Sequence, residues 1–313
     1  DAGLVEEVGV VATAHGPQRV VVFEGSALGL LVGGNAEHLP HAAIVDCTAS
    51  EEVSGRYADW FSQGMHVVTA NKKAQSGPLE YYDSLRTVRR GHNTHFFYEA
   101  SVGAGLPIIQ TLRDLKETGD QIHSIEGIFS GTLAYLFNVF DGSTAFSAIV
   151  REARDNGYTE PDPRDDLSGM DVARKLIILA RELGLQLELA DIEVESLVPP
   201  ALESSSIDDF LEQLGGHDGA MLDRYKQASA AGQVLRYVGS LDRHGKAAVR
   251  LESLPASHSF AHINLTDNIV RFVSERYSDN PLVVQGPGAG PAVTAAGVFA
   301  DLLRLARYLG APG

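Results

Sequence analysis

The sequence predicts an α/β protein of two domains, a largely parallel sheet with helical crossovers and a second, α+β domain. In the first hundred residues, short apolar runs alternate with helical segments and lack the period-two pattern of half-exposed strands. After residue 232, polar and apolar positions alternate, which favours antiparallel strands. The length of 313 residues also exceeds what one hydrophobic core usually accommodates.

The composition is that of a globular protein, with 44% hydrophobic and 21% charged residues. A formal net charge of −16 argues against a surface for nucleic acid or for anionic membranes. No apolar run has the length of a membrane span, and the first residues do not resemble a signal peptide. Cys47 is the only cysteine, which excludes an internal disulfide and indicates a reducing compartment such as the cytoplasm.

The first elements are short strands at residues 8–13 and 19–23. The glycine-rich segment 24–34 follows, at the place where a dinucleotide-binding fold carries G-x-G-x-x-G. The four glycines of this segment do not have that spacing. We therefore interpret residues 24–34 as a loop.

Strands and helices then alternate in the order strand 42–48, helix 51–63, strand 65–70, helix 78–86 and strand 94–100. Thr48 and Lys72 each lie just past the end of a strand. The carboxyl ends of parallel strands share one edge of the sheet, and ligands bind beyond that edge. We therefore expect both side chains near a bound ligand.

Residues 99–109 (EASVGAGLPII) combine a carboxylate with small residues, which allow backbone carbonyl groups to converge. Such a set of oxygen atoms suits a hard monovalent cation. A plain glycine turn before a helix from Leu106 explains the same pattern. A strand at 121–129, the turn Ser130-Gly131-Thr132 and helices at 133–140 and 144–156 follow.

The stretch 157–175 (GYTEPDPRDDLSGMDVARK) holds most of the charged residues that could carry chemistry. Its two prolines favour an extended loop at the start. Asp165 or Asp166 is then expected to cap a helix that ends near Leu183.

Asp171 and Lys175 are four residues apart, so they project from one face of that helix. The following residues are apolar enough to be buried, which places both charges at the mouth of a packed core. A lysine in such a place can transfer protons, and Glu160 with Asp171 could bind the ammonium group of an amino acid. A solvated, charged helix start is the alternative interpretation.

The rest of the chain shows a strand at 192–198 and a helical region at 206–231 that breaks at Gly215-Gly216. Antiparallel strands are predicted at 234–242, 246–254 and 268–277, and the chain ends with strand 281–286, a glycine turn at 286–290 and helix 292–309. The histidines show no metal-ligand spacing.

The stretch 157–175 resembles the signature of the homoserine dehydrogenases, and the likeness runs from about residue 4 to residue 310. It is closest to the dehydrogenase half of bifunctional aspartokinase–homoserine dehydrogenases. The resemblance implies a discontinuous Rossmann-like NAD(P)-binding domain at residues 1–98 and 286–313, and an inserted catalytic and dimerisation domain at 99–285. It also implies that the chain lacks the family's first strand–turn–helix unit, which carries the glycine fingerprint, so that the Rossmann-like domain is N-terminally truncated and incomplete.

The resemblance further implies NAD(P)-dependent, reversible reduction of L-aspartate 4-semialdehyde to L-homoserine, a step of threonine, methionine and isoleucine biosynthesis. The implied residues are Lys175 as general acid/base, Lys72 as second catalytic lysine and cofactor contact, Glu160 and Asp171 for substrate, and Thr48, Gly157 and Gly290 for cofactor. A sodium site maps onto Glu99 and the backbone oxygens of Val102, Ala104 and Leu106. Asp165 and Asp166 are expected to orient Lys175.

Several alternatives remain open. The chain could be an inactive fragment that retains only substrate binding or dimerisation, a structural half of a bifunctional assembly, or a related dehydrogenase of another semialdehyde. The expected partners are the small-molecule substrate and a second copy of the chain. Residues 13–19, where the reader of the cofactor 2′-position is expected, show no selector between NAD and NADP.

Overall fold

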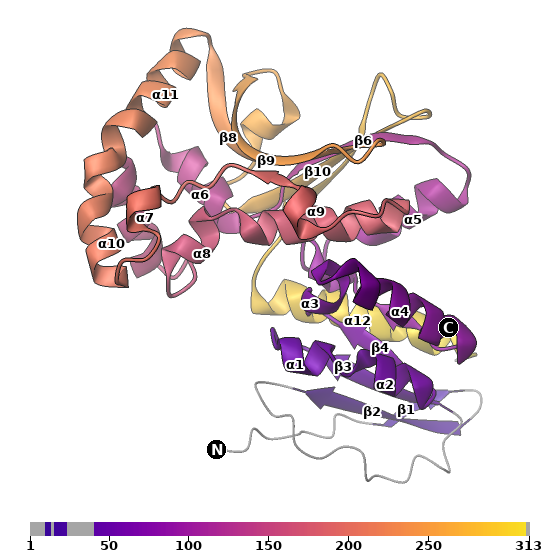
Figure 1. Ribbon diagram of the computed structural model, residues 1–313. Coiled ribbons are helices and arrows are strands. Elements are labelled where there is room, and N and C mark those ends of the chain that lie inside the picture. Colours follow the sequence, from indigo (N-terminus) through magenta and orange to yellow (C-terminus); the bar gives the residue numbers. More distant parts are fainter. Residues whose placement is uncertain (1–9, 14–15, 24–40, 311–313) are drawn as a thin grey trace. The chain divides into compact units, whose positions relative to one another are not determined.

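A computed structural model describes residues 10–13, 16–23 and 41–310 (Figure 1). They form two compact units. Unit 1 holds the described residues up to Pro107 together with those from Gly290 onwards, and unit 2 is Ile108–Ala289. Unit 2 is thus inserted into unit 1 along the chain. The functional boundaries expected from the sequence, at residues 98/99 and 285/286, stay a prediction.

Unit 1 contains a five-stranded sheet in the order β1-β2-β3-β4-β5. The strands are β1 (Val10–Thr13), β2 (Gly16–Phe23), β3 (Ala42–Asp46), β4 (Met65–Thr69) and β5 (Phe96–Phe97). The pairs from β2 to β5 are parallel, which confirms the predicted α/β class. β1 pairs antiparallel with β2, because residues 14–15 alone separate the two strands and a parallel pair needs a crossover connection. The predicted loop 24–34 lies outside the described residues.

The helices of unit 1 are α1 (Glu51–Ser54), α2 (Tyr57–Ser62), α3 (Lys73–Ser76), α4 (Leu79–Gly91) and α12 (Pro291–Tyr308). The single helix predicted for 51–63 is wrong, since Gly55, which has a low helix propensity, ends α1. The strand predicted for 94–100 is also too long, because the chain turns into a 3₁₀ helix at Glu99–Ser101.

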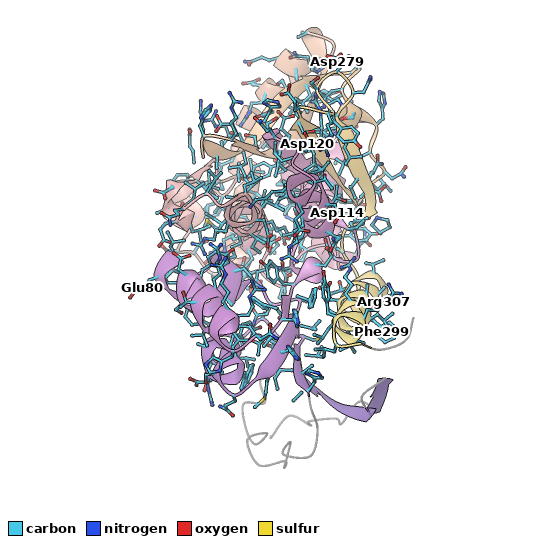
Figure 2. All side chains as sticks on the ribbon, turned by 90° about the vertical axis from the view of Figure 1, so that its right-hand side faces the viewer. Glu80, Asp114, Asp120, Asp279, Phe299 and Arg307 are labelled. Carbon is cyan, nitrogen blue, oxygen red and sulfur yellow. The ribbon has the colours of Figure 1, made fainter. Side chains whose placement is uncertain are left out.

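The core of unit 1 joins the sheet to α12. Buried apolar side chains of this core are Ala43, Val45, Val68, Phe97, Ala100, Val298 and Leu305. Away from this core, α12 carries Phe299 and Arg307, which are exposed (Figure 2). The helix that follows unit 2 in the sequence therefore completes the packing of strands that precede it.

Unit 2 contains a six-stranded sheet in the order β11-β10-β6-β8-β9-β7. The strands are β6 (Ile122–Ile128), β7 (Glu193–Val194), β8 (Gln233–Asp242), β9 (Ala247–Pro255), β10 (Asp267–Ser274) and β11 (Leu282–Pro287). All neighbours are antiparallel except β7 and β9, which confirms the pattern predicted after residue 232. The strand predicted for 192–198 is reduced to the two residues of β7.

The helices of unit 2 are α5 (Ile108–Glu117), α6 (Gly131–Val139), α7 (Phe146–Asp155), α8 (Pro163–Leu167), α9 (Met170–Leu183), α10 (Ile207–Gln213) and α11 (Asp218–Ala230). A 3₁₀ turn at Leu214–His217 separates α10 from α11, which confirms the predicted break. Helix α9 packs against α5 and against β8 and β9 (Figure 1). No helix within the described ranges is long and apolar enough to cross a membrane.

The cap predicted for the helix around Lys175 is wrong. Asp162 caps α8, because its side chain accepts a hydrogen bond from the Arg164 amide at 3.0 Å. Asp165 and Asp166 lie in the first turn of α8. The predicted end at Leu183 is confirmed for α9.

Gly169 is the reason that α8 and α9 are two helices. Its φ of 73° lies in the left-handed region, which favours glycine. A Cβ at this position would also lie 2.1 Å from the Tyr237 hydroxyl. The chain therefore turns at Gly169, and α9 starts with a new direction.

Candidate active site

Lys175 is the centre of the candidate site in unit 2. Its side chain lies on α9, and the residue is 8% exposed. The Nζ atom donates to the carbonyl oxygen of Phe129 at 2.6 Å and lies 2.7 Å from a carboxylate oxygen of Asp171. The expectation that Asp171 and Lys175 share one helix face is confirmed by this ion pair.

Asn268 on β10 contacts the same carbonyl group. Its Nδ2 atom donates to the Phe129 oxygen at 3.1 Å, and the residue is fully buried. Nothing in the sequence pattern indicated Asn268 or the role of Phe129. Asn268 is separated from Phe129 by 139 positions, and no local pattern links the two.

Asp166 connects the loop before α8 to the start of α6. It accepts hydrogen bonds from the Glu160 amide and from the Thr132 hydroxyl, both at 2.8 Å. Burial, opposed by these hydrogen bonds and assisted by the charges of Glu160 and Asp171, raises the pKa of Asp166. These contacts hold the loop that carries Glu160, and an orienting effect of Asp166 on Lys175 stays a prediction.

The side chains of Glu160 and Asp171 remain accessible to a ligand. Glu160 is exposed, while its backbone is fixed through Asp166. The Asp171 side chain is 41% exposed despite its ion pair with Lys175. Gly157 is exposed with a φ of 73°, and a Cβ there would meet no atom within 4 Å. Asp165 is exposed on α8.

In unit 1, the buried carboxylate of Asp46 joins the ends of β3 and β4. It accepts hydrogen bonds from the Thr48 amide at 2.8 Å, from the Asn71 side chain at 3.1 Å and from the Tyr57 hydroxyl. Burial, followed by the charge of Asp46, raises the pKa of Tyr57 well above its usual value, so the hydroxyl keeps its proton. The network fixes both strand ends.

Thr48 and Lys72 belong to the segments that this network holds. The Asn71 side chain, next to Lys72, lies 3.5 Å from the Thr48 hydroxyl. Thr48 and Lys72 are both partly exposed. The expectation that they share the carboxyl edge of the sheet agrees with the parallel pairing of β3 and β4. Asp46 itself is a residue to which the sequence analysis gave no role.

Gly290 precedes α12 with a φ of 112° and is exposed. A Cβ there would meet only Val293, at 3.9 Å. A nucleotide could therefore approach the backbone closely at this point.

Glu99 is the carboxylate of the expected cation site and is 4% exposed. Its amide donates to Asp301 at 2.7 Å, and the Arg304 guanidinium lies 3.6 Å from the Glu99 carboxylate. Ala104 has a φ of 54°, so the following turn is tight. Arg304 thus already supplies positive charge beside the Glu99 carboxylate, and the expected cation site stays a prediction. Over the described positions, no group of three or more His, Cys, Asp or Glu side chains could hold a metal ion.

Two family models match the chain. The model of homoserine dehydrogenase matches residues 107–303, and the model of the NAD-binding domain of homoserine dehydrogenase matches residues 33–99.

Known proteins show the same likeness. A chloroplastic bifunctional aspartokinase/homoserine dehydrogenase of Zea mays is 56% identical over 289 residues, which cover 90% of this chain and 32% of that protein. A homoserine dehydrogenase of Schizosaccharomyces pombe is 46% identical, over 84% of this chain and 72% of that protein. A crystal structure of a Candida auris protein of unknown function has a TM-score of 0.82 at 41% identity, covering 85% of this chain and 76% of that one. The chain spans about a third of the length of the bifunctional relatives.

Proposed function

Because the chain belongs to the homoserine dehydrogenase family, a family of oxidoreductases, we propose that it interconverts L-homoserine and L-aspartate 4-semialdehyde. The observation that carries this proposal is the buried lysine amine held between the Asp171 carboxylate and the Phe129 carbonyl. A nicotinamide cofactor would supply the hydride, and the match of residues 33–99 to an NAD-binding domain supports such a cofactor.

Lys175 acts as the general acid and base in this proposal. In the reductive direction its ammonium group donates a proton to the oxygen of the aldehyde as that oxygen gains negative charge. In the oxidative direction the neutral amine accepts the proton of the hydroxyl group. The contacts with Asp171 and Phe129 orient the amine for both steps.

Glu160 and Asp171 bind the ammonium group of the amino-acid substrate. Both are accessible carboxylates, and a charge-assisted hydrogen bond to an ammonium group is among the stronger contacts in proteins. The hydrogen bond from the Glu160 amide to Asp166 keeps this part of the loop in place.

Thr48, Lys72, Gly157 and Gly290 are the proposed cofactor contacts, with Lys72 also acting as a second catalytic lysine. Support comes from the fixed strand ends that carry Thr48 and Lys72, and from the open backbone at Gly290. Lys72 can attract the anionic cofactor, and either NAD or NADP is consistent with these residues.

A sodium ion would be held by Glu99 with the carbonyl groups of Val102, Ala104 and Leu106, a set of hard oxygen ligands. Pairing of two copies through unit 2, and membership of a larger bifunctional assembly, belong to the same proposal. Relatives named as bifunctional support the assembly, and the single cysteine supports the cytoplasm.

Lys175→Ala tests the proposal directly. We expect kcat for homoserine oxidation to fall by about 10²–10⁴, with a smaller effect on KM, because proton transfer is lost while substrate binding is retained. Steady-state kinetics with NAD and NADP measure both constants. Lys116→Ala is the matched control, since Lys116 is an exposed lysine that donates to the Glu182 carbonyl near the other end of α9.

An unchanged kcat in Lys175→Ala would remove Lys175 from the mechanism. Titration of the wild-type chain with NADPH and NADH, followed by fluorescence, tests the cofactor separately. A folded chain that binds neither nucleotide would contradict the proposed activity and favour an inactive fragment.

A further inference from the structure

We propose that Asn268 is a positioning residue for Lys175, acting through the carbonyl oxygen of Phe129. The inference rests on the proposed role of Lys175 as general acid and base. It adds a residue from β10 to a site whose other proposed groups in unit 2 lie between residues 157 and 175.

The geometry joins the two side chains at one atom. The Phe129 oxygen accepts a hydrogen bond from Lys175 Nζ at 2.6 Å and one from Asn268 Nδ2 at 3.1 Å. Phe129 directly follows β6, which pairs with β10 in the register Ile269 to Ile128. The sheet therefore brings Asn268 beside Phe129, and the amide fixes the oxygen atom on which the lysine amine lies.

Asn268 itself has little freedom to move. It is fully buried, and a Cβ on Gly288 would lie 2.1 Å from its Cγ atom. Gly288 does not have a positive φ, so its backbone does not demand glycine. Glycine at this position instead leaves the space that the Asn268 amide occupies.

The oxygen atom of the Asn268 amide shows that burying this side chain is unfavourable by itself. Within the described part of the chain, the Oδ1 atom of Asn268 is buried and accepts no hydrogen bond. Buried polar atoms in native proteins nearly always have a partner, because an unpaired one loses its hydration without compensation. A residue that served packing alone would be more stable as an apolar side chain here.

Because Lys175 and Asn268 donate to the same Phe129 oxygen, we expect Asn268 to affect the pH at which Lys175 releases its proton. Two donors on one carbonyl group weaken each other, and the positive end of the Asn268 amide lies near the lysine amine. Without Asn268, Phe129 would stabilise the ammonium form of Lys175 more strongly. The amine would then release its proton at higher pH, and the carbonyl oxygen on which it lies would no longer be fixed in position.

Asn268→Leu tests this in the full chain, with homoserine oxidation followed across neutral and alkaline pH. We expect kcat to fall about 10-fold with KM nearly unchanged, and the pH profile of kcat/KM to move to higher pH by about 0.5–1 unit. We expect the melting temperature to be equal to or above that of the wild type, since an unpaired polar atom is removed. Asn268→Ala, which adds no atoms, should show the same shift of the pH profile even if its cavity lowers the melting temperature.

Asn138→Leu is the matched control. Asn138 donates to the carbonyl groups of Asn264 and Leu265, so this variant loses amide hydrogen bonds without touching Phe129. Its pH profile should equal that of the wild type. If both Asn268 variants keep the wild-type kcat and pH profile, or if only their melting temperatures fall, Asn268 is merely structural and the inference is overturned.

A second readout separates this inference from the proposed function. The rate at which an amine-directed reagent modifies Lys175, followed by peptide mass spectrometry, reports on the amine without catalysis. We expect its pH dependence to move upward in Asn268→Leu. An inactive wild-type chain with this shift would contradict the proposed function alone, whereas an unchanged labelling profile would overturn the role of Asn268.

Discussion

Asp46 illustrates how one buried carboxylate can organise the end of a parallel sheet. Its partners come from the segment after β3, from α2 and from the segment after β4, so three parts of the chain meet at one side chain. A buried charge is tolerated only when hydrogen bonds replace its hydration. The stability of unit 1 should therefore depend on each donor to Asp46.

Tyr57→Phe removes the hydroxyl donor to Asp46 and keeps the ring. We expect the free energy of unfolding to fall by about 1–3 kcal/mol, because a buried charged acceptor loses a partner. Denaturant unfolding followed by the fluorescence of Trp60, the single tryptophan, measures the change in unit 1. Tyr81→Phe is the control, since Tyr81 donates to the neutral carbonyl of Ser54. An equal fall in the free energy of unfolding in both variants would show that a hydrogen bond to the Asp46 carboxylate contributes no more than one to a neutral carbonyl group.

At the scale of an element, the junction of α8 and α9 has a glycine for two reasons, its left-handed backbone and the lack of space for a side chain. Gly169 and Gly184 bound α9 at its two ends, and both have left-handed backbone angles. Only at Gly169 would a side chain also collide with a neighbour, the Tyr237 hydroxyl. The two positions separate backbone strain from steric overlap within one helix.

Gly184→Ala should lower the free energy of unfolding by about 1–2 kcal/mol, from the left-handed conformation alone. We expect Gly169→Ala to cost about 1–3 kcal/mol more, because overpacking adds to the same strain. Chemical denaturation followed by circular dichroism compares the two variants. Equal losses would mean that Tyr237 moves aside freely.

Elements with a local cause were predicted from the sequence, whereas those that depend on distant partners were not. The apolar runs gave β3 and β4, and the four-residue spacing gave the Asp171–Lys175 pair. The break at Gly169 was missed, since one of the two reasons for glycine there, the Tyr237 hydroxyl, lies on the distant strand β8. The contact of Asn268 with Phe129 arises only when β10 pairs with β6.

At the scale of the whole molecule, a buried histidine makes stability depend on pH. Burial, followed by the nearby rings of His95 and His41, lowers the pKa of His66 to about 4. The ordinary value of 6.5 applies to the unfolded chain, so between these values the unfolded state binds more protons. The stabilising effect is fully present above the unfolded value and is lost as pH falls towards the folded one.

We expect acidification from neutral pH to pH 4 to remove about 3 kcal/mol from the stability of unit 1 through His66. Urea unfolding followed by Trp60 fluorescence at a series of pH values measures this. His66→Gln, which cannot take up a proton, should show a weaker pH dependence, while His262→Gln, at an exposed histidine of unit 2, should behave as the wild type. Identical curves for all three chains would contradict the assignment to His66.

The insertion of unit 2 into unit 1 also sets an order of events on the ribosome. Val298 and Leu305, which complete the apolar core around β3 and β4, are translated only after all of Ile108–Ala289. At bacterial or eukaryotic elongation rates, that segment takes roughly 10–40 s to synthesise. During this interval, the apolar side chains of β3 and β4 that later pack against α12 lack that cover on the nascent chain. Chaperones or another nascent chain can bind them there. The unit whose synthesis begins first is therefore the last to be completed.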